Sequence, residues 1–429
     1  MTNRQPPNIL LLHWHDLGRC LGCYGWPGVS SPNLDRLAAE GVAFDQAFCT
    51  TPLCSPARGA IFTGRYPHQN GLMGLIPQGW AYHRGEQLWP KLLREHGYHT
   101  ALVGQQHESF CPQTLGFQTM RMVDFWPTCD LIAPMAEEFL RGEALASQPF
   151  FASIGFFDVH RLGKDHYPAD RYPPVDPASF EVPAFLDDNP QTRSDLAGFY
   201  GAIRVADAAL GRILDTLDEV GLRENTWVIF TTDHGMAFPG AKSTLYEPGV
   251  GVSLIMRWPA GFEGRRRVQG LVSHVDLMPT VHEAMGFDRP TGVDGVSFWS
   301  SLCEPHAATP RHALFCERTH HGTHYDPMRS IRTSRYKYIR NFEPGHPPPI
   351  PGDVASSGSA SQLPDRLKTA RPAQELYDLD ADPYEAVNLA DEPGLQVVRQ
   401  DLADQLSQWM NDTDDPIRHG PIELPAAAN

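Results

Sequence analysis

Residues 9–16 read ILLLHWHD, an apolar run that ends in a polar cluster. A run of this length is typical of a buried strand, and similar runs follow at 100–103, 150–157, 227–231 and 252–256. Between these runs, apolar residues recur at helical spacing in segments 34–40, 88–96, 196–220 and 277–285. Strands that alternate with helices predict an α/β fold in which helices enclose a largely parallel sheet.

The pattern changes after Leu302. Short apolar runs then occupy 313–316, 328–332, 336–340 and 376–379, and a helical pattern covers 395–410. We expect a smaller C-terminal antiparallel sheet that carries one helix, and we divide the chain into a catalytic α/β domain at 1–308 and an α+β subdomain at 309–429. Two stretches rich in Pro, Asp, Ser or Gly, at 164–192 and 343–364, are predicted to be loops.

Composition narrows the classes of partner. The 429 residues include 35 Lys plus Arg and 51 Asp plus Glu, for a net charge of −16. This charge repels nucleic acid and anionic lipid, so we expect neither as a partner. No apolar run approaches the roughly 18 residues that cross a bilayer, and the N-terminus lacks a signal-peptide pattern. The eight cysteines are too sparse for a disulfide scaffold, and together these features predict a cytoplasmic protein.

A second decisive stretch is residues 54–65, CSPARGAIFTGR. A helix that begins near Pro56 would place Cys54 at its N-terminal end, where free N–H groups and the helix dipole favour an anion. Arg58, one turn along, would help to hold that anion. The stretch therefore predicts a nucleophile in an oxyanion-binding site. The alternative is a buried structural cysteine beside a helix that starts at proline.

Two polar clusters follow predicted strands. His15 and Asp16 come after the first strand, and Asp233 and His234 come after the strand at 227–231. Ends of neighbouring parallel strands line the ligand crevice of an open α/β sheet, so we expect both clusters to meet beside Cys54. Carboxylate and imidazole groups together suit a divalent cation. Taken alone, each pair could instead cap a helix.

The string at 54–65 resembles the signature of the Cys-type sulfatases of the alkaline phosphatase superfamily. That resemblance implies that a formylglycine-generating enzyme oxidises Cys54 to formylglycine, the nucleophile of the family. It also implies one bound divalent metal, calcium by family resemblance. In the family the first cluster normally holds two adjacent acids, so His15 and His234 move the expected preference toward manganese or zinc. The ligands expected on this basis are His15, Asp16, Cys54, Asp233 and His234.

Further matches follow in chain order. The family's Gly-Lys-x-His corresponds to residues 104–107, with Gln105 in place of the lysine, and its Asp-Pro-His-Arg corresponds to 158–161. The resemblance implies that His107 acts as a base, that His160 protonates the leaving group and that Lys242 binds sulfate oxygens, with Arg58 completing the catalytic set. Arg161 would supply the charge that Gln105 lacks.

Three further stretches, 67–75, 225–249 and 375–389, carry a narrower resemblance within the family. They are most similar to the heparan N-sulfatase (N-sulfoglucosamine sulfohydrolase) branch. By that resemblance, His320 and His321 are candidates to contact the organic part of the substrate. Gln105 and Arg161 are further candidate substrate-binding residues, next to the sulfate. The expected substrate is a small sulfated molecule, first a sugar with an O-linked or N-linked sulfate and next an aryl or alkyl sulfate. The sequence leaves the oligomeric state open.

Two other functions stay open. Phosphonate monoester and phosphodiester hydrolases share the formylglycine nucleophile and an Asp-His metal pair like Asp233 and His234. Their substrates carry one negative charge, as sulfate monoesters do, so charge does not separate the two reactions. A second alternative is a noncatalytic anion-binding homologue that lost its activity through Gln105.

Overall fold

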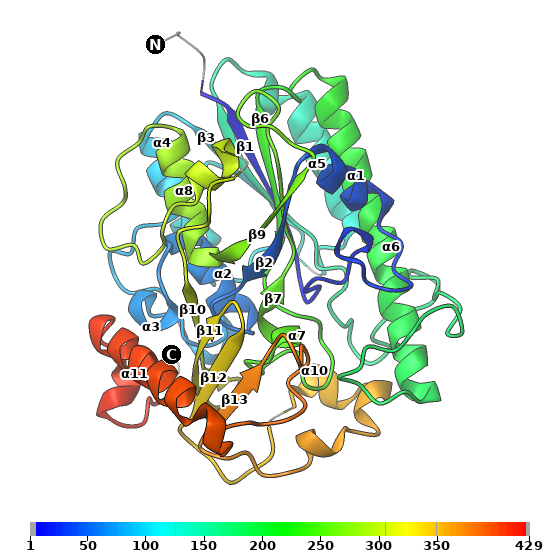
Figure 1. The fold of residues 1–429 in the computed structure, drawn as a ribbon. Coiled ribbons are helices and arrows are strands. Elements are labelled where there is room, and N and C mark those ends of the chain that lie inside the picture. The colour runs from blue at the N-terminus through cyan, green and yellow to red at the C-terminus, as the bar shows by residue number, and fades with distance from the viewer. Residues whose placement is uncertain (1–5, 125, 305, 349, 426–429) are drawn as a thin grey trace.

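The computed structural model describes residues 6–124, 126–304, 306–348 and 350–425 (Figure 1). A large sheet runs through the N-terminal two thirds of these residues in the order β4-β3-β5-β1-β6-β8-β2-β7, and β9 pairs with β2. Its strands are β1 (Asn8–Trp14), β2 (Val42–Phe48), β3 (His99–Gly104), β4 (Thr119–Arg121), β5 (Phe150–Gly155), β6 (Thr226–Thr232), β7 (Gly251–Val252), β8 (Leu254–Arg257) and β9 (Arg266–Ser273).

Strand β1 lies at the centre of this sheet. It pairs in parallel with β5 on one side and with β6 on the other, and all seven of its residues are buried. Strands β7 and β8 run antiparallel to β2, and β8 also runs antiparallel to β6. Because β1 and β6 are parallel neighbours, the segments that follow them leave the sheet at the same edge.

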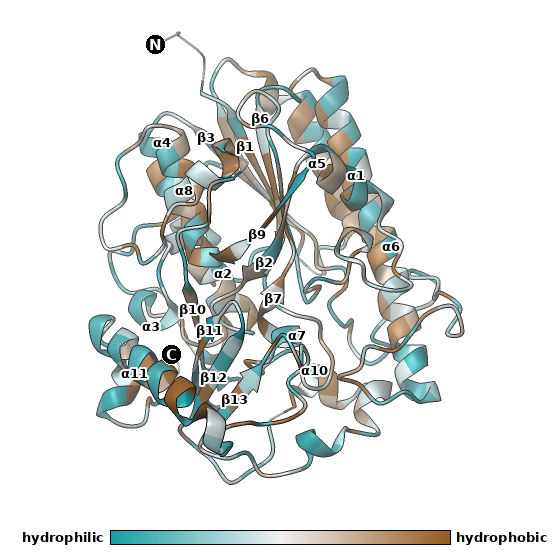
Figure 2. Cartoon of the chain, viewed as in Figure 1, coloured by the Kyte–Doolittle hydropathy of each residue, from teal (hydrophilic) through white to brown (hydrophobic). Residues whose placement is uncertain are grey.

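Helices cover both faces of the large sheet (Figure 1). One face carries α1 (Pro32–Glu40), α5 (Cys129–Arg141) and α6 (Pro190–Glu219), and the other carries α2 (Cys54–Thr63), α4 (Trp89–Glu95) and α8 (Leu277–Ala284). Successive β1 residues divide between these layers: Leu10 and Leu12 pack in the core with α6, whereas Ile9 and Leu11 pack in the core with α2. Brown segments line these inward faces in Figure 2.

The C-terminal region forms a second sheet. Strands β10 (Ala313–His321), β11 (His324–Thr333), β12 (Tyr336–Asn341) and β13 (Gln374–Asp378) pair antiparallel in that order. Helix α11 (Gln396–Asp412) buries Leu402, Leu406 and Trp409 in the same core as Ile331 and Tyr338 of this sheet. The remaining α-helices of the described residues are short: α3 (Pro67–Asn70), α7 (Glu247–Val250), α9 (Trp299–Cys303) and α10 (Gly352–Ala355).

The predicted fold class is confirmed: a mixed, largely parallel α/β sheet lies between helices, and a smaller antiparallel sheet with one helix follows it. The domain boundary after residue 308 stays a prediction. Strands β2 and β9 and helix α5 were not predicted, and the predicted loop at 343–364 contains α10. Among the described residues, none of the helices is both long and apolar enough to span a bilayer.

Candidate active site

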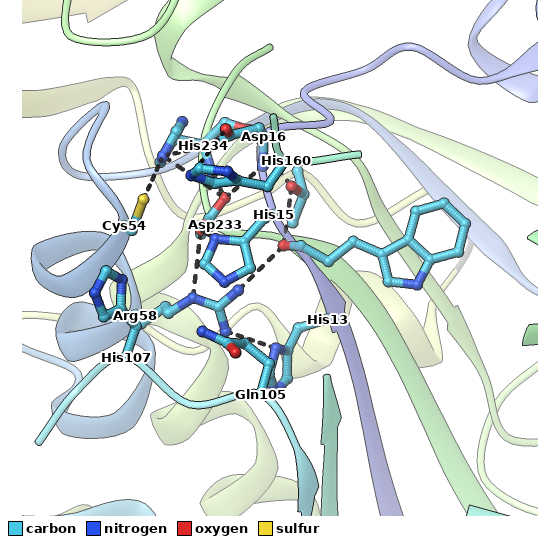
Figure 3. A network of polar contacts seen from close by, with 12 residues as sticks. His13, His15, Asp16, Cys54, Arg58, Gln105, His107, His160, Asp233 and His234 are labelled. Atoms are coloured by element: carbon cyan, nitrogen blue, oxygen red, sulfur yellow. Dashed lines mark hydrogen bonds and ion pairs between the residues drawn. The ribbon is translucent and has the colours of Figure 1, made fainter. Parts of the chain in front are cut away.

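The two polar clusters lie together at the edge where β1 and β6 end (Figure 3). Trp14 pairs with Thr232 at the ends of these strands, so the next residues of each chain segment are neighbours. The backbone N–H groups of Asp16 and His234 both donate to Asp233 Oδ1, at 3.0 and 2.8 Å. Asp16 has a φ of 49°, a left-handed conformation that is uncommon outside glycine. The chain thus turns sharply as it leaves β1 and brings the Asp16 carboxyl group to Asp233.

Cys54 is the first residue of α2, two residues before the expected helix start at Pro56. Its Sγ lies 3.3 Å from His234 Nε2, so the third predicted segment meets the other two (Figure 3). Burial raises the pKa of the Cys54 thiol well above its usual value. A thiol that stays protonated is a weak nucleophile. The unmodified side chain is therefore poorly suited to attack an ester.

Arg58 lies one turn along α2, but its guanidinium is committed to protein groups. Its Nε donates to Asp233 Oδ2 at 3.3 Å, its Nη2 donates to the Trp14 carbonyl at 3.3 Å, and its Nη1 lies 2.6 Å from His13 Nδ1. This arrangement does not support the expectation that Arg58 holds the substrate anion. Instead, Arg58 fixes the Asp233 carboxylate beneath Cys54.

The ring of His234 shows how a cation fits here. Its Nδ1 lies 2.9 Å from the Gly235 carbonyl oxygen, which can only accept, so the ring donates from Nδ1. In the neutral ring, Nε2 then carries a lone pair, and it lies 3.2 Å from Asp16 Oδ1 and 3.8 Å from Asp233 Oδ1. Lone pairs that face one another in a buried site repel each other, and a cation bound between them removes that repulsion.

His15 supports the same conclusion. The potential ligand atoms of His15, Asp16, Cys54 and Asp233 all lie within 4.8 Å of one another, and the four residues are buried. Both His15 ring nitrogens and Asp16 Oδ1 are buried without a hydrogen bond among the described residues, although His15 Nδ1 is 2.8 Å from Asp233 Oδ2. Burial holds the pKa of His15 well below its usual value, so the ring is neutral and able to bind metal.

Charges around Asp233 keep this acid ionised. Burial alone would raise its pKa, but His234, His15 and Arg58 hold the pKa of Asp233 well below its usual range. The donor set of the cluster is two carboxylates and two imidazoles beside residue 54, and such nitrogen-containing sets suit manganese or zinc as well as harder cations.

Lys242 closes the other side of the cluster. Its Nζ lies 2.8 Å from Asp16 Oδ2, 2.7 Å from Asp353 Oδ2 and 3.3 Å from His160 Nε2. Burial would lower the pKa of Lys242, but Asp16 and Asp353 raise it well above its usual value. The side chain is therefore a fixed ammonium group. Burial and this ammonium group lower the pKa of His160.

His107 lies on the segment that follows β3. Its ring centroid is 6.2 Å from that of His15, and its Nδ1 is buried without a hydrogen bond among the described residues. Burial lowers the pKa of His107 to about 3, so the ring is neutral at physiological pH. Gln105 donates from Nε2 to the backbone oxygen of Gln106, and its neutral amide stands where the family has a lysine.

Arg161 does not supply the missing charge. Its guanidinium makes a two-point ion pair with Asp195 at 2.7 and 2.8 Å, and its Nε donates to the Ala237 carbonyl at 2.8 Å. Its side chain is fully buried. Because all three guanidinium nitrogens already donate to Asp195 or to the Ala237 carbonyl in a fully buried position, Arg161 does not replace the family lysine at Gln105, and this expectation is wrong.

The two neighbouring histidines of β10 point in different directions, as successive strand residues do. His320 Nε2 is 2.8 Å from the Ile422 carbonyl, and its ring packs near Trp80. His321 Nδ1 lies 3.1 Å from Ser243 Oγ, beside Lys242 in the chain. The structure thus places His321 near the cluster and commits His320 to packing, which corrects the expectation for His320.

Sequence reasoning missed two acids of this network, and it gave no role to His13, which lies in the polar end of residues 9–16. Asp353 belongs to α10, in a stretch expected to be an irregular loop. Glu108 is buried with Oε1 3.8 Å from Arg58 Nη1, and His13 is the buried partner of the same guanidinium. Glu108 directly follows His107, and His13 precedes the first cluster, so proximity in sequence was an available signal for both. Asp353 has no motif around it that would have identified it.

Exposure shows from which side a substrate reaches this network. Cys54, Asp16, Asp233 and Lys242 are all buried. By contrast, the side chain of His160 is 17% exposed and that of Asp353 is 24% exposed. The bound part of a substrate therefore passes these two side chains before it reaches residue 54.

Comparison with known families defines the class of the protein. A sulfatase family model matches residues 7–287, and a model of the N-sulphoglucosamine sulphohydrolase C-terminal region matches residues 234–346. The chain belongs to the sulfatase family and is a sulfuric ester hydrolase.

Individual relatives are similar to this protein over nearly the whole chain. N-sulphoglucosamine sulphohydrolase of Homo sapiens is 28% identical over 468 residues, which cover 97% of this chain and 92% of that protein. A Bacteroides fragilis protein assigned as a sulfatase shares the fold with a TM-score of 0.80 at 21% identity, over 98% of both chains. A protein solved in complex with its substrate D-glucosamine-2-N,6-O-disulfate has a TM-score of 0.73 at 18% identity, over 96% of this chain and 99% of the other.

Proposed function

We propose that this sulfatase hydrolyses an O-linked or N-linked sulfate of a sugar. Its nucleophile would be a formylglycine made from Cys54. The convergence of Cys54, Asp16 and Asp233 at one buried point is the observation that carries the proposal. The sugar is favoured because the human relative is an N-sulphoglucosamine sulphohydrolase and a structural neighbour binds a sulfated glucosamine. Maturation would require a formylglycine-generating enzyme as a transient partner.

The modification would give residue 54 two hydroxyls on one carbon when hydrated, one to attack sulfur and one to release sulfate by elimination. We infer that one divalent cation is held by His15, Asp16, Asp233 and His234 beside that side chain. Its charge would favour ionisation of the attacking hydroxyl and offset charge on the sulfate.

The remaining side chains supply proton transfer and anion binding. Lys242 offers a fixed ammonium to sulfate oxygens, which stabilises the charge that develops during transfer. Burial and neighbouring cations lower the pKa values of His160 and His107, and the negative charge of a bound sulfate would raise them again. His160, at the exposed rim, would then donate a proton to the leaving oxygen or nitrogen, and His107 would accept the proton released when the sulfated side chain eliminates sulfate. Gln105 provides a neutral hydrogen-bond donor in place of the family lysine, so we expect weaker binding of sulfate.

Co-expression with a formylglycine-generating enzyme tests the proposal. Mass spectrometry of the Cys54 peptide should show the aldehyde, and only the converted fraction should hydrolyse sulfate esters, with Cys54→Ala as the inactive control. Rates on phosphodiesters and phosphonate monoesters are measured beside those on sulfates. A large preference for phosphodiesters, or a wholly unconverted and inactive protein from cells that have the modifying enzyme, would refute the proposed reaction.

A further inference from the structure

Asp353 is an acidic residue that lies beside the groups proposed to bind the anionic sulfate. Its Oδ2 lies 2.7 Å from the Lys242 ammonium and 4.0 Å from His160 Nε2, the two groups proposed to handle the sulfate and its leaving group. A sulfate oxygen that shares Lys242 with this carboxylate would lie roughly 4 to 5 Å from it, a separation at which like charges repel. Some feature of the substrate must offset that repulsion.

The Asp353 carboxylate is held in place rather than free to swing away. Val354, the next residue, is buried. A few residues later, the Ser359 hydroxyl donates to Asp195 Oδ2 at 2.6 Å, and Asp195 is the two-point partner of buried Arg161. Asp195 of helix α6 thus anchors the segment that carries Asp353, and Arg161 holds the Asp195 carboxylate in place. The Asp353 carboxylate is therefore held in a fixed position beside His160.

The two oxygens of the Asp353 carboxylate differ in their hydrogen bonding. Oδ2 accepts from Lys242, but no described residue donates a hydrogen bond to Asp353 Oδ1. The side chain is 24% exposed beside His160, where the leaving group of a substrate would lie. A carboxylate in this position accepts strong hydrogen bonds and repels further anions.

We propose, resting on the proposed function above, that Asp353 is a specificity-determining residue that accepts a hydrogen bond from the leaving group. The donor is a hydroxyl or an ammonium group on a carbon next to the one that carries the sulfate. The carboxylate thereby selects polyhydroxylated or amino sugars. It also disfavours substrates whose neighbouring carbon carries a second sulfate or a carboxylate.

Pairs of substrates that differ in these donors test the inference on converted full-length protein. N-sulfoglucosamine has hydroxyls on both carbons that flank the sulfated position, whereas cyclohexylsulfamate has the same linkage and ring size without them. Glucose 3-sulfate and cyclohexyl sulfate form the same pair for an O-linkage, and glucosamine 3-sulfate replaces a flanking hydroxyl with an ammonium group. The variant is Asp353→Asn, and Asp365→Asn, an exposed acid nearby, is the matched control.

For the linkage that the enzyme hydrolyses, Asp353→Asn should lower kcat/KM on the sugar sulfate about tenfold, mainly through KM, and change the cyclohexyl analogue less than threefold. A larger loss on glucosamine 3-sulfate than on glucose 3-sulfate would identify ammonium as the preferred donor, and a smaller or equal loss would identify hydroxyl. Asp365→Asn should change neither rate.

Equal losses on the sugar and on its cyclohexyl analogue would overturn the inference, because Asp353 would then act only through Lys242. Unchanged rates on both would overturn it as well. Should the variant fail to fold, the wild type still decides: a kcat/KM for the cyclohexyl analogue equal to or above that for the sugar contradicts a role for the flanking donor. Absence of hydrolysis of every sulfate by converted protein is a different result, since it refutes the proposed function itself.

Discussion

Among the described residues, two buried clusters combine histidine with two acids, yet their hydrogen bonding differs. In the first, His68, Glu317 and Asp415 surround Arg329 between α3 and the C-terminal sheet. Each carboxylate oxygen there accepts from a donor: the His68 N–H and ring meet Glu317, and Arg329 Nε and Nη2 meet Asp415 at 2.5 and 2.9 Å. The charges are matched within the protein, which is the pattern of a structural ion-pair network.

The second cluster, at the ends of β1 and β6, is not matched in this way. The carboxylates of Asp16, Asp233 and Asp353 outnumber the two cations that contact them, Lys242 and Arg58. Asp16 Oδ1 accepts no hydrogen bond among the described residues. The comparison teaches that clustering of ligand-type residues does not by itself indicate a cation site. Excess negative charge and an unpartnered carboxylate oxygen are the features that do so.

Removal of one charged group from each cluster should have a different consequence, and the catalytic effect is the largest that we expect. Asp16→Asn should lower kcat/KM on a sulfate ester about 10³-fold, because several kcal/mol of charge stabilisation by the cation is lost. It should also weaken binding of Mn²⁺ in titration calorimetry. The exposed acid Asp215, changed to Asn, is the control. Unchanged metal binding in Asp16→Asn would contradict the assignment of the unmatched cluster.

Disruption of the first cluster, around Arg329, should lower the stability of the protein. Arg329→Met leaves Glu317 and Asp415 buried without their cation, so the free energy of unfolding should fall by about 3 to 5 kcal/mol. Arg335→Met removes a half-exposed partner of Asp378 and should leave the free energy of unfolding nearly unchanged. Urea denaturation measures both. Similar losses in the two variants would show that the Arg329 network is not a buried structural one.

A smaller effect should appear as pH dependence of stability. Burial would lower the pKa of His68, but Glu317 raises it above its usual value. The folded state therefore binds this proton more tightly than the unfolded chain, and the resulting stability is complete below the unfolded pKa of about 6.5. It is lost as pH rises through the higher folded pKa. Unfolding free energies of wild type and His68→Gln should converge as pH rises, and a difference that grows with pH would contradict this.

The smallest effect concerns the support of Asp353. Ser359→Ala removes the hydroxyl that donates to Asp195, so the free energy of unfolding should fall by about 1 kcal/mol. We expect kcat/KM on a sugar sulfate to fall about threefold, less than in Asp353→Asn, because the carboxylate is only held less firmly. Steady-state kinetics with Ser361→Ala as the control measures this difference. A loss larger than that of Asp353→Asn would contradict the anchoring role.

Local sequence patterns predicted the elements that hold the cluster. Buried runs at 9–13 and 227–231 became β1 and β6, and the residues after them meet because parallel neighbours end at one edge. Strands β2 and β9 escaped prediction since polar residues interrupt their apolar runs. Helix α5 escaped as well, with Pro134 inside it.

The sequence was less informative about where charged side chains point. Arg161 follows His160 in a family-like motif, yet its guanidinium turns to Asp195 on α6, a contact that no local pattern encodes. Asp353 reaches Lys242 from 111 positions away, out of a stretch of Pro, Gly and Ser. Long-range pairing of this kind depends on how the C-terminal segment packs, so the motif predicted the centre of the site but not its entrance.

Anomalous diffraction from crystals of the active, converted protein tests the central claim most directly. Data collected on both sides of the absorption edges of manganese and zinc locate and identify a bound ion. The account predicts one peak, bounded by Asp16, Asp233, His234 and residue 54, and none at His68, Glu317 and Asp415. A fully active crystal with no ion beside residue 54, or with the ion in the Arg329 network instead, would contradict it.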